Sequence, residues 1–334
     1  MSHCRAVPLV VIAIVAAIVG VLLVTAAHAG DMQGTTVDEL AQLQLPRPSE
    51  VTVALLPFWD YKNLSRHTEV CRHHLHRYFT RHGFTVVPPA LVSAVVSQDT
   101  KLEPGVPMRR DDAVRIAAKV GADWAIYGNV LQLETYEKKS AFSKRKKAQV
   151  SIKLTVVAAD SGEVLFWRQR FDTSGGHGGF TKRATSMERT AADVCLTRIL
   201  KDFFAALPDH ELQQEAGSCC APLAQGKVRE AYEADPGSVE ATIAYAQSLI
   251  CWHKADDAES ILARAVRRDK TNADLHFWHG VSLYALGEAA AAQAEWQQTV
   301  QLAPAHPYAT HLLAVFASAQ SPAHTTEGMS ATAQ

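Results

Sequence analysis

The spacing of apolar residues between 50 and 207 changes several times along the chain, and each spacing predicts an element. Residues 51–58 form a continuous apolar, β-branched run, which is typical of a strand covered on both faces. Apolar residues then recur at helical spacing over 65–82, and 84–88 predicts a second strand. Two shorter helices, over 89–98 and from about 112 to 120, precede a third strand at 123–134.

The pattern changes after residue 148. Residues 149–159 and 163–171 alternate between apolar and polar side chains on either side of a short turn, which predicts an antiparallel hairpin with one polar face. A glycine-rich loop and a helix over about 181–206 follow. The order β-α-β-α-α-β-β-β-α predicts an α/β domain whose mixed sheet has a parallel half, an antiparallel meander and flanking helices.

The region from 208 to 320 is helical and repetitive. Small or apolar residues recur 34 positions apart, as in Ala246 and Gly280, Ala258 and Ala292, and Leu262 and Trp296. A period of 34 with small residues at helix crossings is the signature of tetratricopeptide repeats, and the unit 273–304 closely resembles one. An earlier unit is degenerate, and 308–319 predicts a capping helix. We therefore expect an all-α tetratricopeptide solenoid after the α/β domain.

The α/β region also resembles a known family. The segments VALLPFWDYKNLS, KVGADWAIYGNV and VVAADSGEVLFWRQRFD are similar to motifs of the TolB amino-terminal-like and CsgG-like domains of bacterial envelope proteins. The resemblance covers about 50–206 and implies a domain that binds other envelope proteins without a catalytic centre. The connection at 135–148 is too short for the transmembrane hairpins of the pore-forming branch.

The first residues predict export. Residues 7–27 are uncharged and apolar, and Ala27-His28-Ala29 is a signal-peptidase site that would leave Gly30 as the new N-terminus. The apolar run is also long enough to be a retained inner-membrane anchor. The expected organisation is a signal peptide or anchor (1–29), a linker (30–49), the α/β domain (50–207), the repeats (208–320) and a disordered tail (321–334).

Export into an oxidising compartment would favour disulfide bonds. Cys251 ends a repeat helix, and Cys219 or Cys220 opens the helix that we expect beside it, so one bridge is predicted there. Cys71 and Cys195 lie on the apolar stripes of two predicted helices and could form a second bridge. Alternatively, these two are buried small hydrophobic residues.

Composition and motifs exclude several functions. A net charge of −1 gives no reason to expect nucleic-acid binding. The sequence has no P-loop, G-x-S-x-G, H-E-x-x-H or C-x-x-C, so we expect neither an enzyme nor a cofactor. The histidines of helix 65–82 point in different directions at 100° per residue, which predicts a solvated face rather than a metal site. An enzyme that uses this helix, through His67 and His74, is the remote alternative.

A basic run of six lysines and arginines lies within 138–147. At the tip of a hairpin it could contact anionic lipid headgroups, or it could be a solvated surface. Two segments are therefore candidates for membrane contact: residues 7–27 and this basic run.

The repeat family's groove positions can be transferred to this chain by register. They predict an aromatic-lined concave surface with two carboxylates at one edge, suited to a peptide or helix of a partner protein. The alternative is that some of these apolar residues pack against the first domain. The predicted groove residues are Glu240, Ile243, Gln247, Ile250, Asp274, Phe277, Val281, Tyr284, Tyr308 and His311.

These inferences predict an exported, non-catalytic adaptor of the bacterial cell envelope. It would bind an envelope protein or peptide through the repeat groove and the α/β domain. The alternative is a membrane-anchored sensory or regulatory module with the same two domains outside the membrane.

Overall fold

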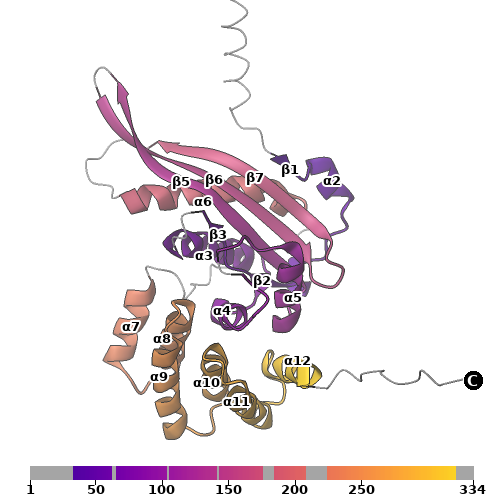
Figure 1. The fold of residues 1–334 in the computed structure, drawn as a ribbon, viewed down its shortest axis with the longest axis vertical. Helices are drawn as coiled ribbons and strands as arrows, with labels where there is room; N and C mark the ends of the chain where they lie inside the picture. Colours follow the sequence, from indigo (N-terminus) through magenta and orange to yellow (C-terminus); the bar gives the residue numbers. More distant parts are fainter. Residues whose placement is uncertain are drawn as a thin grey trace, which may run out of the picture.

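The computed structural model describes residues 33–61, 65–103, 105–140, 143–175, 184–207 and 224–320. A twisted sheet with helices on both faces forms the first part, and a short array of helix pairs lies against one side of it (Figure 1). The expected α/β fold followed by an all-α repeat array is confirmed.

The described part of the sheet has seven strands in the order β1-β7-β6-β5-β2-β4, with β3 paired to β5. β2 runs parallel to β4 and β5, whereas β5, β6, β7 and β1 are antiparallel neighbours. The predicted parallel half and antiparallel meander are therefore both present. The strands are β1 (Gln33–Gly34), β2 (Thr52–Leu55), β3 (Trp59–Asp60), β4 (Thr85–Val86), β5 (Trp124–Ser140), β6 (Ser143–Ala158) and β7 (Val164–Gly175).

Helices cover the two faces of the sheet in pairs. α3 (Ser65–Arg81) and α6 (Ala184–Ala205) pack on one face, where Phe79, Phe166 and Phe203 are fully buried. α4 (Pro89–Ser97) and α5 (Arg110–Val120) lie on the other face, against Ala54 and Ala125. The continuous apolar run of β2 follows from this burial on both sides.

The repeats add a further layer over α4 and α5 (Figure 1). Their caps repeat with the same period as their core: Ser238 and Asn272, 34 positions apart, each accept a hydrogen bond from the backbone three residues later. His253 and Gly287, also 34 apart, both have positive φ in the turn between paired helices. The helices are α7 (Ala224–Ala234), α8 (Val239–Cys251), α9 (Ala255–Arg268), α10 (Ala273–Ala285), α11 (Ala289–Leu302) and α12 (Ala309–Gln320).

The predicted linker is more ordered than expected. β1 pairs with β7 at the sheet edge, and α2 (Val37–Gln42) begins with a capping box in which Thr36 and Glu39 bond each other's backbone N–H. A short 3-10 helix, η1 (Pro48–Glu50), follows. The T-x-x-E spacing was the sequence signal for α2, and the prediction of an extended linker missed it.

The hairpin between β5 and β6 is also longer than predicted. Backbone pairing continues to Ser140 and Ser143, so the segment expected to be a connection is a two-stranded ribbon that projects from the sheet (Figure 1). The apolar alternation ends near Glu134 because the ribbon beyond that point leaves the helix-covered core.

The described residues include no helix long and apolar enough to cross a membrane. Residues 7–27, with the predicted cleavage site and anchor, lie outside the described residues, as does the predicted tail at 321–334.

Gly280 allows α10 and α11 to approach closely. An added Cβ would lie 2.6 Å from Nε1 of Trp296 and 3.1 Å from the backbone oxygen of Ala292. Trp296 is fully buried, and its Nε1 donates to the backbone oxygen of Phe277 at 3.3 Å. The indole therefore has little room to give way.

We predict that Gly280→Ala lowers the free energy of unfolding by about 1–3 kcal/mol, because the added methyl overpacks this contact. The control is Gly226→Ala on α7, where an added Cβ meets nothing within 4 Å. There the substitution should be neutral or stabilising by up to about 1 kcal/mol. Urea denaturation measures both. Equal stability of the two variants would contradict the close-approach argument.

Candidate functional site

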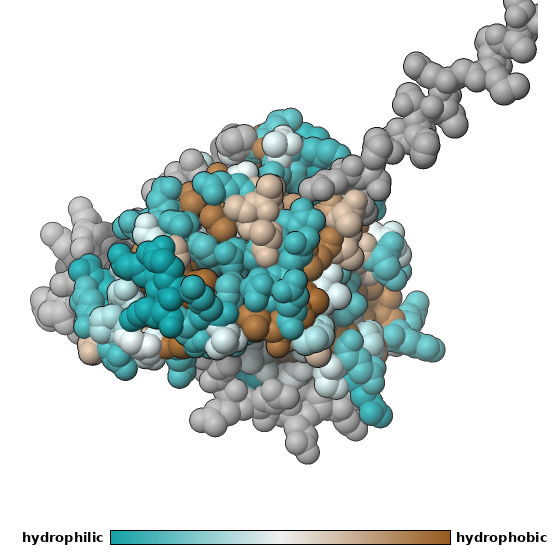
Figure 2. Space-filling view, turned by 90° about the horizontal axis from the view of Figure 1, so that it is seen from below, coloured by the Kyte–Doolittle hydropathy of each residue, from teal (hydrophilic) through white to brown (hydrophobic). Residues whose placement is uncertain are grey.

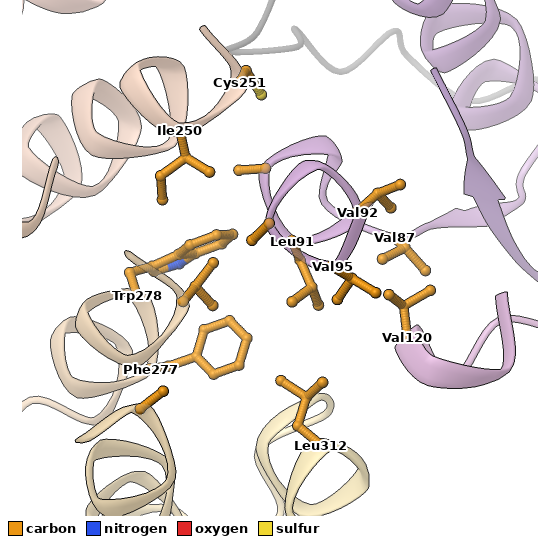
Figure 3. Close-up of a cluster of buried hydrophobic side chains, with 14 of the residues drawn as sticks. Val87, Leu91, Val92, Val95, Val120, Ile250, Cys251, Phe277, Trp278 and Leu312 are labelled. Carbon is orange, nitrogen blue, oxygen red and sulfur yellow. The ribbon is translucent and has the colours of Figure 1, made fainter. Parts of the chain in front are cut away.

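The concave surface of the repeats is filled by α4 of the same chain. Seven residues of this nine-residue helix are buried: Pro89, Ala90, Leu91, Val92, Ser93, Ala94 and Val95. One side of α4 packs on β2 and α5, and the opposite side packs on α8 and α10. Figure 3 shows Leu91 and Val95 pointing toward Phe277, Trp278 and Leu312 of the repeats.

Two polar contacts accompany this apolar interface. The side-chain amide of Gln98, just beyond α4, donates to the backbone oxygen of Ala285 at 2.8 Å. Nε2 of His311 on α12 lies 2.9 Å from the backbone oxygen of Ala118 on α5. Its ring packs over Gly121, which ends α5 in the left-handed conformation. The two domains are therefore held by directional bonds around a continuous apolar core.

The predicted groove residues fall into three groups. Ile250, Phe277 and Val281 are at most 3% exposed and share one buried cluster with α4. Ile243, Gln247, Tyr284, Tyr308 and His311 are half-buried, and of these His311 bonds to α5. Glu240 and Asp274 are exposed at the edge.

The sequence analysis favoured an open groove that binds a partner peptide, and the structure corrects this prediction. The groove holds α4 of the same chain, in agreement with the alternative that its apolar residues pack against the first domain. The signal was present in the sequence: PALVSAVVS is apolar on all sides, and such a helix must be buried on all sides.

A cleft of about 690 Å³ opens beside this interface. It lies beyond the carboxyl end of β2, which has β4 on one side and β5 on the other, both parallel to it. Ligand sites of parallel sheets occur at such switch points. Its lining includes Phe58, Trp59, Asp60, Asp99, Met108, Arg109, Asp111, Asp112 and, from the repeats, His253.

One buried carboxylate of the cleft, that of Asp99, serves a structural role. Asp99 accepts two hydrogen bonds from Arg115, both at 3.1 Å, and one from Lys119 at 2.7 Å. Burial alone would raise the pKa of Asp99, but these bonds outweigh it and hold the pKa well below its usual range. The network ties the end of α4 to α5, and Asp112 joins it through Arg115 at 2.8 Å.

The histidines of α3 whose side chains the structure describes do not form the solvated face that was predicted. His74 is 5% exposed, and its Nδ1 lies 2.9 Å from a carboxylate oxygen of Asp193 on α6. Burial, with Arg72 nearby, lowers the pKa of His76 to about 4. Part of the polar side of α3 is covered because α6 packs beside it, and the helical spacing of the histidines does not reveal this contact. The described residues contain no group of three or more side chains placed to hold a metal ion.

Of the two disulfide bonds that the sequence suggested, the one between Cys71 and Cys195 does not form. Cys71 and Cys195 are buried free thiols, so a bridge between them is excluded here. Burial raises the pKa of both, and Sγ of Cys195 contacts the backbone oxygen of Arg170 at 3.6 Å. They act as small core residues, as the alternative stated. Cys251 is disulfide-bonded, and its two proposed partners, Cys219 and Cys220, lie outside the described residues.

A cluster of titratable groups that the sequence analysis missed lies within the repeats. Glu295 on α11 contacts two histidines of α10, with His276 Nδ1 at 2.6 Å and His279 Nδ1 at 3.1 Å. His279 Nε2 is 3.5 Å from Glu259 on α9. Burial alone would lower the pKa of His279, but the two carboxylates outweigh it and raise the pKa above its usual value.

Comparisons with known proteins give faint likenesses. No family model and no curated protein matches the sequence. Among solved structures, the chain is similar to the PelC dodecamer from Paraburkholderia phytofirmans, at 12% identity and TM-score 0.35, over 54% of this chain and 99% of that one. It is also similar to lipoprotein GNA1162 from Neisseria meningitidis, at 15% identity and TM-score 0.32, over 45% and 99%.

The repeat region is similar to the first TPR domain of the human RPAP3 protein, at 22% identity and TM-score 0.27, over 29% of this chain and 76% of that one. At such identities and TM-scores these likenesses carry no argument about function. The fold rests on the elements and pairings described above.

We predict that Phe277→Ala lowers the free energy of unfolding by about 3–5 kcal/mol, because it leaves a cavity between α4 and the repeats. The control is Glu240→Gln, another predicted groove position, whose exposed side chain should change stability by no more than about 0.5 kcal/mol. Urea denaturation of both variants is the measurement. A similarly small effect at Phe277 would mean that the groove is open in solution.

We also predict pH-dependent stability from His279. Because its folded pKa is raised, its protonated form contributes stability that is fully present below the unfolded pKa of about 6.5 and is lost as pH rises through the folded pKa. His279→Gln should therefore destabilise the protein more near pH 5.5 than near pH 8.5. Thermal unfolding of both proteins at the two pH values tests this. A stability loss that is independent of pH would show that the ion pairs do not form.

Proposed function

We propose that this protein is an exported, non-catalytic scaffold of the bacterial cell envelope that presents a rigid two-domain surface to protein partners. The observation that carries the proposal is the seating of α4 in the concave surface of the repeats. A repeat array that holds its own neighbouring domain fixes the relative position of the two parts. Such a body is suited to hold partners at a set distance.

The energetics of α4 support a permanent rather than a displaceable contact. Its residues belong to the core of the α/β domain on one side and to the repeat core on the other. Each large apolar side chain that left this site would lose about 1.5–3 kcal/mol of burial. A partner peptide that displaced α4 would therefore have to compensate for several such side chains together with the bonds of Gln98 and His311.

The chemistry of the cleft beside β2 supports a non-catalytic role. Asp99 and Asp112 are neutralised by Arg115 and Lys119. Catalytic acids and bases are usually tuned toward the working pH, whereas the pKa of Asp99 is moved away from it. We propose that the cleft is a structural junction of the two domains.

The partner surfaces proposed here lie away from the groove. The ribbon formed by β5 and β6 projects from the sheet, and the sequence places its basic run there. Phe171 on β7 is 42% exposed on the side of the sheet opposite α6. Viewed from the repeat end, the molecule presents a largely hydrophilic face with scattered apolar areas (Figure 2). Contact of the basic run with anionic lipid is part of this proposal.

The second candidate is a membrane-anchored sensory or regulatory module. It is favoured by the length of the apolar run 7–27, which would suffice to span a bilayer. Intact mass of the protein purified from an envelope fraction separates the two. A chain that starts at Gly30 supports the exported scaffold, and a chain that retains residues 1–29 supports the anchored module.

We predict that the backbone amides of α4 exchange with solvent at the rate set by global unfolding, because the groove does not open separately. Native-state hydrogen exchange under increasing denaturant measures this, with the exposed helix α7 as an internal reference that should exchange faster. Exchange of α4 by a sub-global opening, with α10 released at the same time, would show instead that the groove opens to admit a partner.

A further inference from the structure

A pocket of about 350 Å³ between α7 and α9 has a lining dominated by arginine. Three guanidinium groups surround it, from Arg264, Arg267 and Arg268, together with Tyr232 and Pro236. All three arginines are exposed. They lie on the second helices of the repeats, whereas the surface that holds α4 is formed by α8 and α10. The pocket is therefore separate from the filled groove.

The arginines are oriented by contacts that leave donors available. Arg268 donates one hydrogen bond to the backbone oxygen of Pro236 at 2.7 Å, and Arg264 contacts the hydroxyl of Tyr232 at 3.5 Å. Within the described residues no ion pair joins any of the three to a carboxylate. Because a guanidinium carries five donors in a fixed planar fork, most of their donors can reach an anion.

The acidic side chains nearest in sequence are engaged elsewhere. Glu233 pairs with Arg229 at 2.7 Å. Asp235 accepts a hydrogen bond from the backbone of Gly237 at 3.0 Å. Asp269 accepts from the backbone of Thr271 at 3.0 Å and from its hydroxyl at 2.8 Å. Among the described residues, none of these three carboxylates therefore forms an ion pair with an arginine of the pocket.

The repeat architecture does not require these arginines. Thirty-four positions later in the chain, their counterparts on α11 are Gln298, Gln301 and Leu302. α11 forms with no basic residue in its last turn, so the second helix of a repeat does not require one there. The charge is specific to one junction of the array.

We propose that this arginine pocket binds the side-chain carboxylates of an acidic segment in a partner protein. Clusters of arginine bind carboxylate and phosphate groups through paired, charge-assisted hydrogen bonds. The pocket volume falls in the range of roughly 300–1,000 Å³ that is usual for small-ligand sites, and Tyr232 and Pro236 give it an apolar wall for the carbon atoms of a peptide. The inference rests on the proposed scaffold function and names the chemistry of one partner.

The test is isothermal titration of the full exported chain with hexaglutamate, with hexaglutamine as a neutral peptide and with inorganic phosphate alone. The pocket variant is Arg264→Gln/Arg267→Gln, which leaves the bond between Arg268 and Pro236 in place. The matched control is Lys227→Gln/Lys254→Gln, which also removes two positive charges, from exposed positions outside the pocket lining, and leaves the Arg229–Glu233 ion pair in place. Urea denaturation confirms that both variants fold.

We expect hexaglutamate to bind and hexaglutamine not to bind. The pocket variant should bind hexaglutamate with an affinity at least about tenfold lower, since each charge-assisted bond contributes that much. The affinity of the control variant should fall by less than about threefold. Equal weakening in the two variants, or no binding of hexaglutamate, would overturn the proposal. Pocket-dependent binding of phosphate without binding of hexaglutamate would also overturn it and identify a free phosphate site. Amide exchange of α4 is unaffected in each case, so the scaffold proposal stands or fails separately.

Discussion

The burial of α4 on both of its sides is the contact on which the rest of the architecture depends. A nine-residue helix without a polar face cannot cover a sheet unless something covers the helix in turn. The repeats supply that cover through Phe277, Trp278 and Ile250. The α/β domain and the repeats are for this reason consecutive layers of one core, although their sequences resemble separate modules.

This arrangement changes which surfaces are open to partners. The concave side of a tetratricopeptide array is the expected recognition site, and here it is used within the chain. Gln98 and His311 extend the contact with bonds to backbone oxygens, while Arg115 and Lys119 hold Asp99 at the end of α4. The charged groups that would first suggest a site in the cleft thus tie α4 to α5 within the α/β domain. The recognition surfaces that we propose are the projecting ribbon and the outer helices of the repeats.

Much of the fold could be predicted from the sequence because its signals are local. The period of 34 placed Gly280 against Trp296, and apolar spacing placed the main strands and helices. The misses were short or polar elements. β3 has two residues, α2 depends on one capping box, and the ribbon beyond Glu134 carries no apolar alternation. Such elements are stabilised by residues that are close in space but distant in sequence, and the periodicity of apolar residues does not reveal those contacts.

The candidate sites show the same division. The sequence by itself determined the two modules and the groove register, since both depend on spacing within a few helical turns. The tertiary structure alone decided that α4 fills the groove, that Cys71 and Cys195 stay unpaired, and that His276 and His279 share Glu295. These outcomes depend on which faces of helices and strands pack together when the elements are far apart in the sequence. Shape complementarity and burial decide that packing, and the pattern of apolar residues along the chain contains information on neither.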